Sequence, residues 1–505
     1  MKDGRIFSIA DRITMSQPQQ LYLHNLQGST PSFVLSALFM HNATQQLNHV
    51  VVLNDAEEAA YFHNSVESLT KALDLFYFPS SFKNKKNFRL LNSSHVMLRT
   101  EALTKLSQGG NKKILITYPE ALFEKVVLPK ALAGNMIYLK AGDVLDVDAT
   151  LEKFVDYGFE RTDFVYEPGQ FAVRGGILDI YSFGNEKPYR VELFGNDIDS
   201  IRLFDPETQL SERKLLQVTI IPNVETQFDS SEKVSLFEFL PENTVVWMQD
   251  WDVIEAAVKE QQEDLDAYIA YYKETGGAKK ERLNEEEELE KTVITVNDFV
   301  PVHTLVQQIQ QRHVVEIGRE PLFPGKSSFE INFKTQQQPA FNRQFDLLIK
   351  DLKNREAAKY SIYIFAENPK QLERLYSIFT DLKAAIAFTP VPVSIHEGFI
   401  DDDLKVVCYT DHQIFQRYHK YKVKQAYNKN KAITLRTLRD LQPGDYVTHI
   451  DHGVGTYSGL QKLEVNGRLQ EAVRIIYKDS DILYVNINSL HKISKYTGKE
   501  GKGRD

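Results

Sequence analysis

Hydrophobic and polar positions follow two different periods along the first 125 residues of the chain. Short apolar runs at residues 50–53 (VVVL) and 113–117 (KILIT) predict strands that are buried on both faces. Residues 57–73 and 119–128 carry apolar positions at helical spacing and predict helices. Because alternating strands and helices are typical of an α/β layer, the sequence predicts an α/β domain in this region.

The hydrophobic pattern changes further along the chain. Between residues 135 and 211 the apolar period is two, interrupted by Gly and Asn, which predicts a small β-rich module. Residues 215–325 return to helix and strand alternation, and residues 341–412 form a second α/β segment. In that second segment we expect a helix that starts with residues 345–352, a helix at 371–382, and strands at 361–366, 391–395 and 404–408. Residues 438–496 consist almost wholly of strand and turn signals.

Composition limits the class of protein. With 505 residues, 42% of them hydrophobic, the chain should form about three to five domains with real cores. No window approaches the roughly 18 consecutive apolar residues of a membrane span, and the start lacks a secretory signal. The single cysteine, Cys408, excludes a disulfide framework within the chain and a CxxC zinc site. We expect a soluble, multidomain, cytoplasmic protein without membrane contact.

The charge pattern argues against a dedicated nucleic-acid coat. The formal net charge is −9 and the isoelectric point about 5.9, whereas such proteins are normally basic. Local basic strips occur at residues 83–86 (KNKK) and 418–431, so any DNA contact should be weak or indirect and sensitive to salt. The charged stretch 279–291, with its acidic run at 285–288, predicts a solvated helical hairpin or a loop.

Motifs for enzyme chemistry are incomplete. A phosphate-binding loop needs GxxxxGK[ST], because backbone amides and a lysine must neutralise the phosphates. Gly325, Lys326 and Ser327 lack the upstream glycine, which is replaced by Glu320, so this match is a coincidence. A second turn leads into a helix but has no lysine, and we expect it not to bind nucleotide; its residues are Gln27, Gly28, Ser29, Thr30, Pro31 and Ser32. We assign no catalytic residue, no metal site and no cofactor.

One stretch carries a long and specific pattern, FAVRGGILDI followed by PYRVELFGNDIDSIR. The paired glycines after Arg174 predict a bulge or a tight bend. The period of two places Arg190 and Phe194 together on one outward face of a strand. Such Arg–aromatic pairs are typical interface anchors, although an ion pair of Arg190 beside a half-buried Phe194 would give the same pattern.

This stretch resembles the domain shared by the excision-repair protein UvrB and the transcription-repair coupling factor (Mfd) family. The resemblance implies binding to the repair protein UvrA through residues that match Arg174, Arg190 and Phe194 here. UvrB keeps a working phosphate loop upstream of this module. In this chain the turn at residues 27–32 lacks the lysine of such a loop, so the chain resembles the coupling factors rather than UvrB.

A second stretch reads GDYVTHIDHGVGTYSGL and, further on, YVNINSLHKISKY. Five short strands in about fifty residues suggest a small β-barrel. The unit is similar to the RNA-polymerase-interacting domain of the Mfd family and to CarD-type regulators, which implies an SH3/Tudor-like barrel that docks on the polymerase β subunit. We expect the strand at 461–465 to make the contact, with Leu463 as apolar anchor and Lys462 and Glu464 at the rim. An ordinary core role for Leu463 is the alternative.

The resemblance implies a complete organisation for the chain. Its fold class is multidomain α/β, and its parts are a degenerate nucleotide-binding-like, UvrB-like α/β domain (1–134 and 212–325), an inserted α+β UvrA-binding module (135–211), an α/β spacer domain (330–412), a linker (413–433), the polymerase-interacting β-barrel (434–498) and a polar linker (499–505) before an absent motor. The chain would be an adaptor and not an enzyme, because ATP and Mg²⁺ belong to the motor of the family. Two alternatives stay open: a UvrB-like DNA-repair helicase subunit, which would bind nucleotide, and a CarD-like polymerase regulator, which would not bind UvrA.

Overall fold

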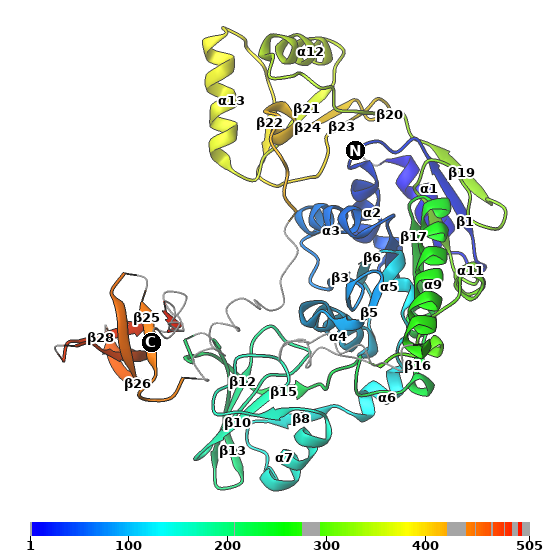
Figure 1. The fold of residues 1–505 in the computed structure, drawn as a ribbon. Coiled ribbons are helices and arrows are strands. Elements are labelled where there is room, and N and C mark those ends of the chain that lie inside the picture. Colours follow the sequence, from blue (N-terminus) through cyan, green and yellow to red (C-terminus); the bar gives the residue numbers. More distant parts are fainter. Residues whose placement is uncertain are drawn as a thin grey trace, which may run out of the picture. The chain divides into compact units, whose positions relative to one another are not determined.

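The computed structural model describes residues 3–206, 208–274, 293–421, 441–449, 451–465, 468–478, 480–486 and 493–496 (Figure 1). The chain divides into two compact units, Met1–Ala131 with Phe228–Lys424, and Leu132–Gln227 with Gln425–Asp505. The two main sheets of the first unit belong to α/β layers, and the second unit contains a six-stranded sheet, a two-stranded sheet and a five-stranded sheet, all antiparallel except for the parallel pair β9–β10. The predicted hairpin or loop at 279–291 lies outside the described residues, as does most of the basic strip at 418–431.

The first sheet of unit 1 has seven parallel strands in the order β19-β1-β18-β17-β2-β6-β3 (Figure 1). These strands are β1 (Gln20–His24), β2 (Asn48–Val52), β3 (Leu75–Phe78), β6 (Ile114–Thr117), β17 (Thr244–Met248), β18 (Val314–Glu316) and β19 (Phe329–Asn332). All residues of β2, β6 and β17 are buried, as expected for parallel strands that are covered on both faces. The predicted apolar strands at 50–53 and 113–117 are confirmed.

Helices connect and cover this sheet. They are α1 (Gly4–Ile13), α2 (Thr30–Met40), α3 (Ala56–Thr70), α4 (Ser93–Ser107), α5 (Pro119–Phe123), α8 (Leu236–Phe239), α9 (Trp251–Glu274) and α11 (Val302–Gln310). Asp55 caps α3 by accepting the amide of Glu58, and Lys71 ends that helix in the left-handed conformation. Smaller pieces are the hairpin β4 (Phe82–Asn84) and β5 (Asn87–Leu91), the pair β7 (Val126–Val127) and β16 (Lys233–Val234), α6 (Pro129–Gly134), and the 3₁₀ turns η1 (Asn42–Thr44), η2 (Ser230–Glu232) and η3 (Val296–Asp298).

The second sheet of unit 1 has five strands in the order β20-β23-β24-β21-β22. They are β20 (Thr335–Gln337), β21 (Ser361–Phe365), β22 (Thr389–Val391), β23 (Phe399–Asp401) and β24 (Val406–Thr410), with helices α12 (Phe345–Ala357), α13 (Pro369–Asp381) and α14 (Asp411–Ile414). The helices α12 and α13 place Leu348, Leu352 and Leu375 in a core with strand residues of β21 and β24. The predicted strand at 391–395 is wrong in extent, because β22 ends at Val391.

The two α/β sheets of unit 1 are joined by a shared apolar cluster. Phe33 of α2 packs edge-on against Phe365 and Phe399, with ring centroids 5.9 and 5.0 Å apart. Buried Ile395 and Cys408 complete this cluster on the side of the second sheet. The second α/β segment therefore has a core in common with the first, in addition to its own.

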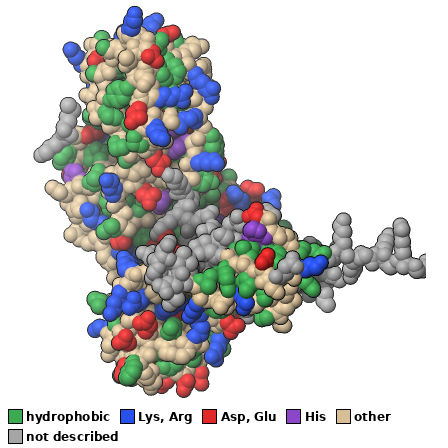
Figure 2. Space-filling model, turned by 90° about the vertical axis from the view of Figure 1, so that its left-hand side faces the viewer, with side chains coloured by type: hydrophobic (Ala, Val, Ile, Leu, Met, Phe, Trp, Pro, Cys, Tyr) green, Lys and Arg blue, Asp and Glu red, His purple; other side chains and the backbone are tan. Residues whose placement is uncertain are grey.

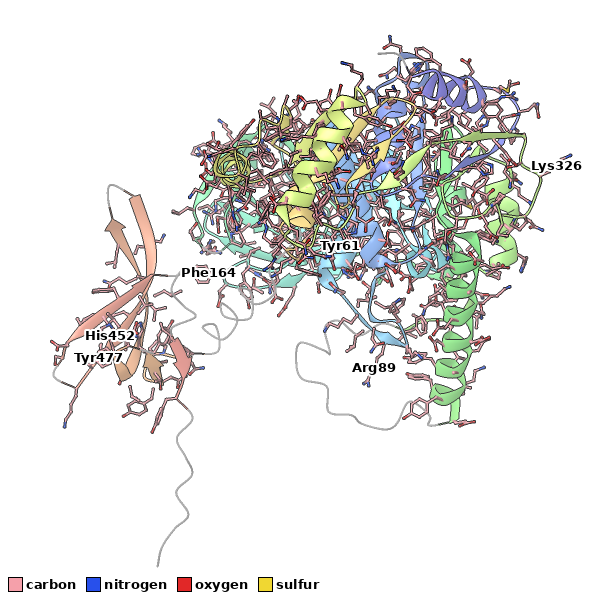
Figure 3. All side chains as sticks on the ribbon, turned by 90° about the horizontal axis from the view of Figure 1, so that it is seen from above. Tyr61, Arg89, Phe164, Lys326, His452 and Tyr477 are labelled. Carbon is pink, nitrogen blue, oxygen red and sulfur yellow. The ribbon has the colours of Figure 1, made fainter. Side chains whose placement is uncertain are left out.

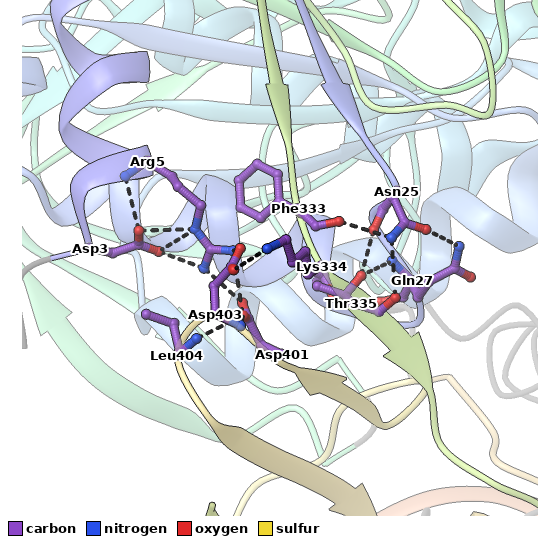
Figure 4. Close-up of polar contacts among 11 residues, drawn as sticks. Asp3, Arg5, Asn25, Gln27, Phe333, Lys334, Thr335, Asp401, Asp403 and Leu404 are labelled. Carbon is purple, nitrogen blue, oxygen red and sulfur yellow. Dashed lines mark hydrogen bonds and ion pairs between the residues drawn. The ribbon is translucent and has the colours of Figure 1, made fainter.

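Polar contacts reinforce the same junction (Figure 4). Arg5 lies 2.7 Å from Asp401 and 2.9 Å from Asp3, and its guanidinium covers the ring of Phe333. Its side chain is 14% exposed and that of Asp401 is 4% exposed, so the ion pair is largely shielded from solvent. Because burial of one partner alone would leave an uncompensated charge, this pair fixes the relation of α1 to β23.

Unit 2 begins with the module that was predicted to be β-rich. Its main sheet has the order β14-β13-β12-β11-β10-β9, and a separate pair joins β8 to β15. The strands are β8 (Ile137–Lys140), β9 (Glu160–Arg161), β10 (Gln170–Arg174), β11 (Ile177–Ile180), β12 (Tyr189–Phe194), β13 (Asp197–Phe204), β14 (Ser211–Leu215) and β15 (Gln217–Ile220), with one helix, α7 (Val147–Asp156). The core comprises Phe154 of α7 and inward residues of the sheet such as Phe171, Leu178 and Val191.

The C-terminal part of unit 2 is a five-stranded antiparallel sheet in the order β28-β27-β26-β25-β29. The strands are β25 (Tyr446–His449), β26 (Gly453–Val465), β27 (Arg468–Ile476), β28 (Ile482–Asn486) and β29 (Ile493–Lys495). Val447, Tyr457, Val473 and Ile475 form its small core. The five predicted strands are confirmed. Among the described residues they pair in a row with β28 and β29 at its ends.

Surface charge and helix hydropathy agree with the composition. On the face of the molecule drawn in Figure 2, Lys and Arg side chains lie among Asp and Glu side chains. Within the described ranges, none of the helices combines the length and the apolar character that spanning a membrane requires.

The shared cluster at Phe33 gives a first prediction. Phe33→Ala should lower the free energy of unfolding by about 2–3 kcal/mol, because a largely buried phenyl ring is removed from a site that cannot fully collapse. Urea unfolding of the whole chain measures this change. Leu73→Ala is the matched control, since Leu73 is 98% exposed and its loss should change stability by less than about 0.5 kcal/mol. Equal urea midpoints for the two variants would contradict a stabilising role of Phe33 in the shared cluster.

A second prediction concerns pH. Burial lowers the pKa of His49 to about 4, and its Nδ1 accepts a hydrogen bond from Trp247 Nε1 at 3.1 Å. Burial and the neighbouring His419 and His412 lower the pKa of His396 to about 4 as well. Since an unfolded histidine titrates near pH 6.5, the unfolded chain binds more protons between pH 6.5 and 4. The free energy of unfolding should therefore fall as the pH drops through this window.

Tryptophan fluorescence measures this dependence, because Trp247 is one of only two tryptophans in the chain. His49→Gln removes one of the titrating groups and should flatten the decline in stability between pH 6.5 and 4. An unchanged pH slope in this variant would contradict the assignment.

Candidate functional site

The predicted arginines of the module meet at one buried carboxylate. Asp179 of β11 is fully buried, and both of its oxygens accept hydrogen bonds from Arg190 of the adjacent strand β12, at 2.8 and 2.9 Å. Arg174, at the end of β10, donates to the same carboxylate at 2.7 Å. A forked guanidinium–carboxylate contact of this kind fixes orientation as well as charge.

Aromatic rings and a carbonyl complete the environment of these guanidinium groups. The guanidinium of Arg190 lies 4.5 Å from the centre of the Phe204 ring, and that of Arg174 lies 4.6 Å from Phe164. Arg190 also donates to the carbonyl of Gln209 at 2.9 Å. The Arg190 side chain is 12% exposed and that of Arg174 is 35% exposed. The side chain of Arg190 is thus largely buried, whereas part of the Arg174 side chain is exposed to solvent.

Phe194 has a different environment from the arginines. It ends β12 at the tip of a hairpin, pairs with Asp197, and is 83% exposed. Gly195 adopts a φ of 63°, which the tight turn needs. Val144 bridges to Asp197 from the other side and is 74% exposed. Since paired residues of antiparallel strands share a face, Val144, Asp197 and Phe194 form an exposed row.

The structure agrees with one part of each interpretation of the sequence pattern, the exposed Arg–aromatic pair and the ion-paired arginine. Arg190 is ion-paired, as the alternative interpretation had it, whereas Phe194 is not half-buried but almost fully exposed. The paired glycines form the two-residue turn between β10 and β11. Gly175 has a φ of 60°, and a Cβ on Gly176 would lie 2.7 Å from the carbonyl of Leu193. Gly175 therefore suits the positive φ of the turn, and Gly176 allows the close approach to β12.

Asp179 is the residue of the candidate site that the sequence reasoning missed. Its signal is a single carboxylate within the otherwise apolar strand Ile177–Ile180, directly opposite Arg190 in the strand register. A lone charge in a core strand needs a partner, and the strand pairing supplies it.

The predicted polymerase-contact residues lie near the end of β26. Leu463 is half-buried and pairs with Gln470, whereas Lys462 is exposed. Glu464 belongs to the same strand, but its side chain is outside the described set. A register shift between Tyr457 and Leu460 interrupts the pairing of β26 with β27. The strand therefore offers the partly accessible Leu463 beside an exposed lysine, and Leu460 of the same strand is 39% exposed.

The turn that resembles a phosphate loop is occupied by protein backbone. The Ser29 amide donates to the carbonyl of Glu397 at 3.1 Å, and the Glu397 amide donates back to Ser29 Oγ at 2.9 Å. The Gln27 amide donates to Thr335 Oγ1 at 2.9 Å (Figure 4). Gly28 has a φ of 54°, and a Cβ there would lie 2.4 Å from the carbonyl oxygen of Gly398.

Three more residues of this turn lead into the helix. Thr30 donates from its hydroxyl to the carbonyl of Gln27, Pro31 stands in the first turn of α2, and Ser32 is buried. In a working phosphate loop the backbone amides at this point face phosphate oxygens. Here the amides of Gln27 and Ser29 are bonded to the second α/β segment instead.

A cavity of about 720 Å³ adjoins this turn at the carboxyl ends of β1, β2, β17 and β18. Ligands of open α/β sheets commonly bind at this edge. Its carboxylates include Glu58, whose pKa is raised by burial and by Asp55, and Asp250, which pairs with Arg319 at 3.3 Å. No lysine is among the described residues that line it. The cavity is therefore poorly suited to a polyphosphate.

Metal binding has no support from the part of the chain that the structure describes, where no cluster of three or more His, Cys, Asp or Glu side chains could hold an ion. The ring centroids of His449 and His452 lie 4.8 Å apart with the planes tilted by 41°, and these two residues are not part of such a cluster.

Comparison with known families gives two matches, each in one of the two stretches described above. Residues 137–225 match the UvrB interaction domain, and residues 441–497 match the CarD-like/TRCF RID domain. The first match contains the Asp179 cluster and Phe194, and the second contains β25 to β29.

Curated relatives extend the similarity along the chain. The transcription-repair-coupling factor of Bacillus subtilis (strain 168) is 24% identical over 95% of this chain and 45% of its own length. That of Staphylococcus haemolyticus (strain JCSC1435) is 25% identical over 96% of this chain and 46% of its own length. The chain thus spans less than half the length of these relatives. The resemblance stated from the sequence is confirmed.

The Asp179 cluster gives a third prediction. Asp179→Asn should lower the stability of the module by about 3 kcal/mol, because Arg190 would keep its buried charge without a compensating carboxylate. Differential scanning calorimetry of the whole chain measures the change. Glu192→Gln is the matched control, since that side chain is 37% exposed and its nearest arginine contact, to Arg202, is 3.9 Å long. Equal melting temperatures for both variants would contradict a structural role for Asp179.

Proposed function

We propose that this chain, which corresponds to the N-terminal portion of a transcription-repair-coupling factor, is an adaptor that binds UvrA through one module and RNA polymerase through another. The observation that carries the proposal is the presence of a UvrB interaction domain and a CarD-like/TRCF RID domain in one chain. An adaptor for transcription-coupled excision repair needs a surface for each machine. The whole protein would add an ATP-driven DNA translocase to these surfaces.

The UvrA surface of this proposal centres on the tip of β12. Phe194 offers an exposed aromatic ring, and aromatic side chains are frequent hot spots of protein interfaces. Arg174 contributes its partly exposed guanidinium, while Arg190 orders the strand through Asp179. Direct contact thus falls mainly to Phe194 and Arg174, with Arg190 as a positioning residue.

The polymerase surface of this proposal is the strand β26. Leu463 supplies the apolar contact and Lys462 a charge at the rim, with Glu464 in the same role. The partner would be the β subunit. The five-strand row of this unit supports an SH3/Tudor-like barrel, in which loops and an exposed strand remain available for binding.

For the remaining parts we propose the organisation given by the sequence: a split α/β domain at 1–134 and 212–325, the UvrA module at 135–211, an α/β spacer at 330–412, a linker at 413–433 and the barrel at 434–498. The first of these would be a nucleotide-binding-like fold that no longer binds nucleotide. The bond between Ser29 and Glu397 and the acidic cavity support this loss and weigh against a UvrB-like helicase subunit. The protein would act in the cytoplasm.

A fourth prediction separates the two surfaces. Phe194→Ala should abolish capture of purified UvrA and leave capture of the polymerase β subunit unchanged, because only an exposed ring is lost. Leu463→Arg should have the opposite effect, since it places a charge at the apolar contact. Pull-down with the purified 505-residue chain measures both interactions.

The choice of variant follows from the structure. Arg190→Glu would place a second carboxylate beside buried Asp179 and unfold the module, so loss of binding by that variant would be uninformative. Tyr138→Ala is the control for Phe194, since Tyr138 is an aromatic residue of the same module that is 67% exposed. Crossed effects, or equal UvrA capture by the wild-type chain and the Phe194 variant, would contradict the adaptor assignment.

A further inference from the structure

The chain contacts α3 where it leaves the second α/β segment. The last helix of that segment, α14, ends at Ile414, and residues 416–421 beyond it are called the exit segment below. Tyr61 of α3, labelled in Figure 3, donates from its hydroxyl to the carbonyl of His419 at 2.7 Å. Its ring meets that of Tyr421 edge-on, with centroids 4.9 Å apart. The proposed adaptor function gives no role to this contact.

Four rings hold the exit segment at this place. They are Tyr61, His396, His412 and His419, which together form the histidine cluster. The Tyr61 ring stacks on His396, with centroids 3.6 Å apart and planes inclined by 15°. His419 stacks on His412 at 4.2 Å and 8°, and lies 5.8 Å from His396. Because the other rings come from α3, the loop before β23 and α14, the cluster joins the exit segment to three further parts of unit 1.

The hydrogen bonds of the histidine cluster fit neutral imidazoles. His412 Nε2 donates to the carbonyl of His396 at 2.7 Å, and His419 Nε2 lies 2.7 Å from Ser394 Oγ. The Nδ1 atoms of His396 and His419 lie 3.5 Å apart. A hydrogen bond between two ring nitrogens needs one N–H and one lone pair, so at least one of these two rings must be neutral. A proton added to the accepting ring would leave two N–H groups facing each other.

Charged and titratable groups lie on every element that forms the cluster. They are Glu57 and Glu58 on α3, Glu397 in the loop before β23, Asp411 on α14, and Arg417, Tyr418, Lys420 and Tyr421 in the exit segment. Asp411 lies 3.8 Å from His412 Nδ1, but its carboxylate already pairs with Arg417. Burial and the neighbouring His419 and His412 lower the pKa of His396 to about 4. The cluster therefore favours neutral imidazoles in spite of the carboxylates nearby.

The residue before the exit segment is anchored independently of the histidines. Phe415 is buried, and the guanidinium groups of Arg374 and Arg417 lie 4.5 and 5.6 Å from the centre of its ring. Its carbonyl accepts a hydrogen bond from Arg343 Nε at 3.2 Å. Loss of the histidine contacts would therefore free the chain beyond Arg417 and leave the second α/β segment in place.

We propose that the histidine cluster is a pH-dependent switch, which binds the exit segment to α3 while its imidazoles are neutral and releases the segment when it takes up a proton. This regulation goes beyond the proposed adaptor function. Release separates the rings, so that an added charge no longer faces a second N–H at 3.5 Å or a stacked imidazole at 4.2 Å.

The direction of the pH dependence follows from the protons that each state binds. A histidine in contact with water titrates near pH 6.5, whereas His396 of the bound state has a pKa of about 4. The released state thus binds more protons between these values, and attachment of the exit segment weakens as the pH falls through this window. For one proton, the ratio of released to bound chains rises about tenfold per pH unit. Above pH 6.5 the segment stays bound.

Electron paramagnetic resonance of a nitroxide spin label at Lys420→Cys tests this proposal on the 505-residue chain. Lys420 is exposed and the native Cys408 is buried, so the label attaches to the exit segment. The label should be immobilised at pH 7.5, and the ratio of mobile to immobilised label should rise at least about tenfold between pH 7.5 and about 5. A label at Lys353→Cys, an exposed position of α12, is the matched control and should not change.

Two variants test the effect of charge at pH 7.5, where the fold is retained. His419→Lys places a permanent charge in the cluster and should make the label at position 420 mobile without acid. His419→Gln is the matched neutral variant, in which the hydrogen bond from Tyr61 to the backbone carbonyl remains. It should keep the label immobilised at pH 7.5 and reduce its response to acid. Circular dichroism of each variant checks the fold.

Four outcomes would overturn the proposal. The first is equal mobility of the label at position 420 at both pH values. The second is release of the label at position 353 at the same pH, which would show unfolding of the segment rather than local release. The third is an immobilised label in His419→Lys, and the fourth is an unchanged acid response in His419→Gln. An acid response confined to the exit segment, and reproduced at pH 7.5 by the lysine variant alone, would support the switch.

Discussion

The close approach of two backbones, at Gly28 and Gly398, is the constraint on which the architecture of unit 1 depends. A side chain at either position would collide with carbonyl oxygens, because the added Cβ would lie 2.4 Å from the Gly398 oxygen or 2.7 Å from that of Cys408. The approach allows Ser29 and Glu397 to exchange hydrogen bonds, and it lies beside the shared apolar cluster around Phe33. The second α/β segment consequently contributes Gln337, His396 and Glu397 to the wall of the cavity at the edge of the first sheet.

In the inserted module, a second constraint gives the charged residues and the exposed aromatic residue different environments. Asp179 forms ion pairs with two arginines that the family resemblance assigns to UvrA binding, and it holds one of them, Arg190, in a largely buried position. Phe194, which belongs to the exposed row with Asp197 and Val144, lies at the far end of the same strand as Arg190, β12. Arginine and phenylalanine thus contribute differently to one surface: the first by fixing the strand, the second by offering area for contact.

Local features of the fold were predictable from the sequence, and long-range ones were not. The strands β2 and β6 and the alternation of β12 follow from hydrophobic periodicity, which reports which face is buried. The predicted helix at 119–128 is shorter in the structure, where α5 ends at Phe123, because Val126 and Val127 pair with β16. A short apolar run does not reveal such a pairing.

The candidate sites show the same division. Phe194 could be singled out because a family motif contains it, and Leu463 because the resemblance implies contact through the strand at 461–465, whereas Asp179 required the strand register to show its partner. The bond between Ser29 and Glu397 joins residues more than 360 positions apart and has no local signature. Sequence reasoning saw the missing lysine of the turn but could not see what takes the place of the phosphate.

The order of strands in the first sheet has a consequence for biosynthesis. β1 lies between β18 and β19, so its edges stay unpaired until residues 314–332 have left the ribosome. At roughly 5–20 residues per second, about 300 further residues take roughly 15–60 seconds to translate. The inserted module at 132–227 has all of its own strands long before then and can fold first. During that interval both edges of β1 are open and could pair with another chain, until β18 and β19 enclose the strand.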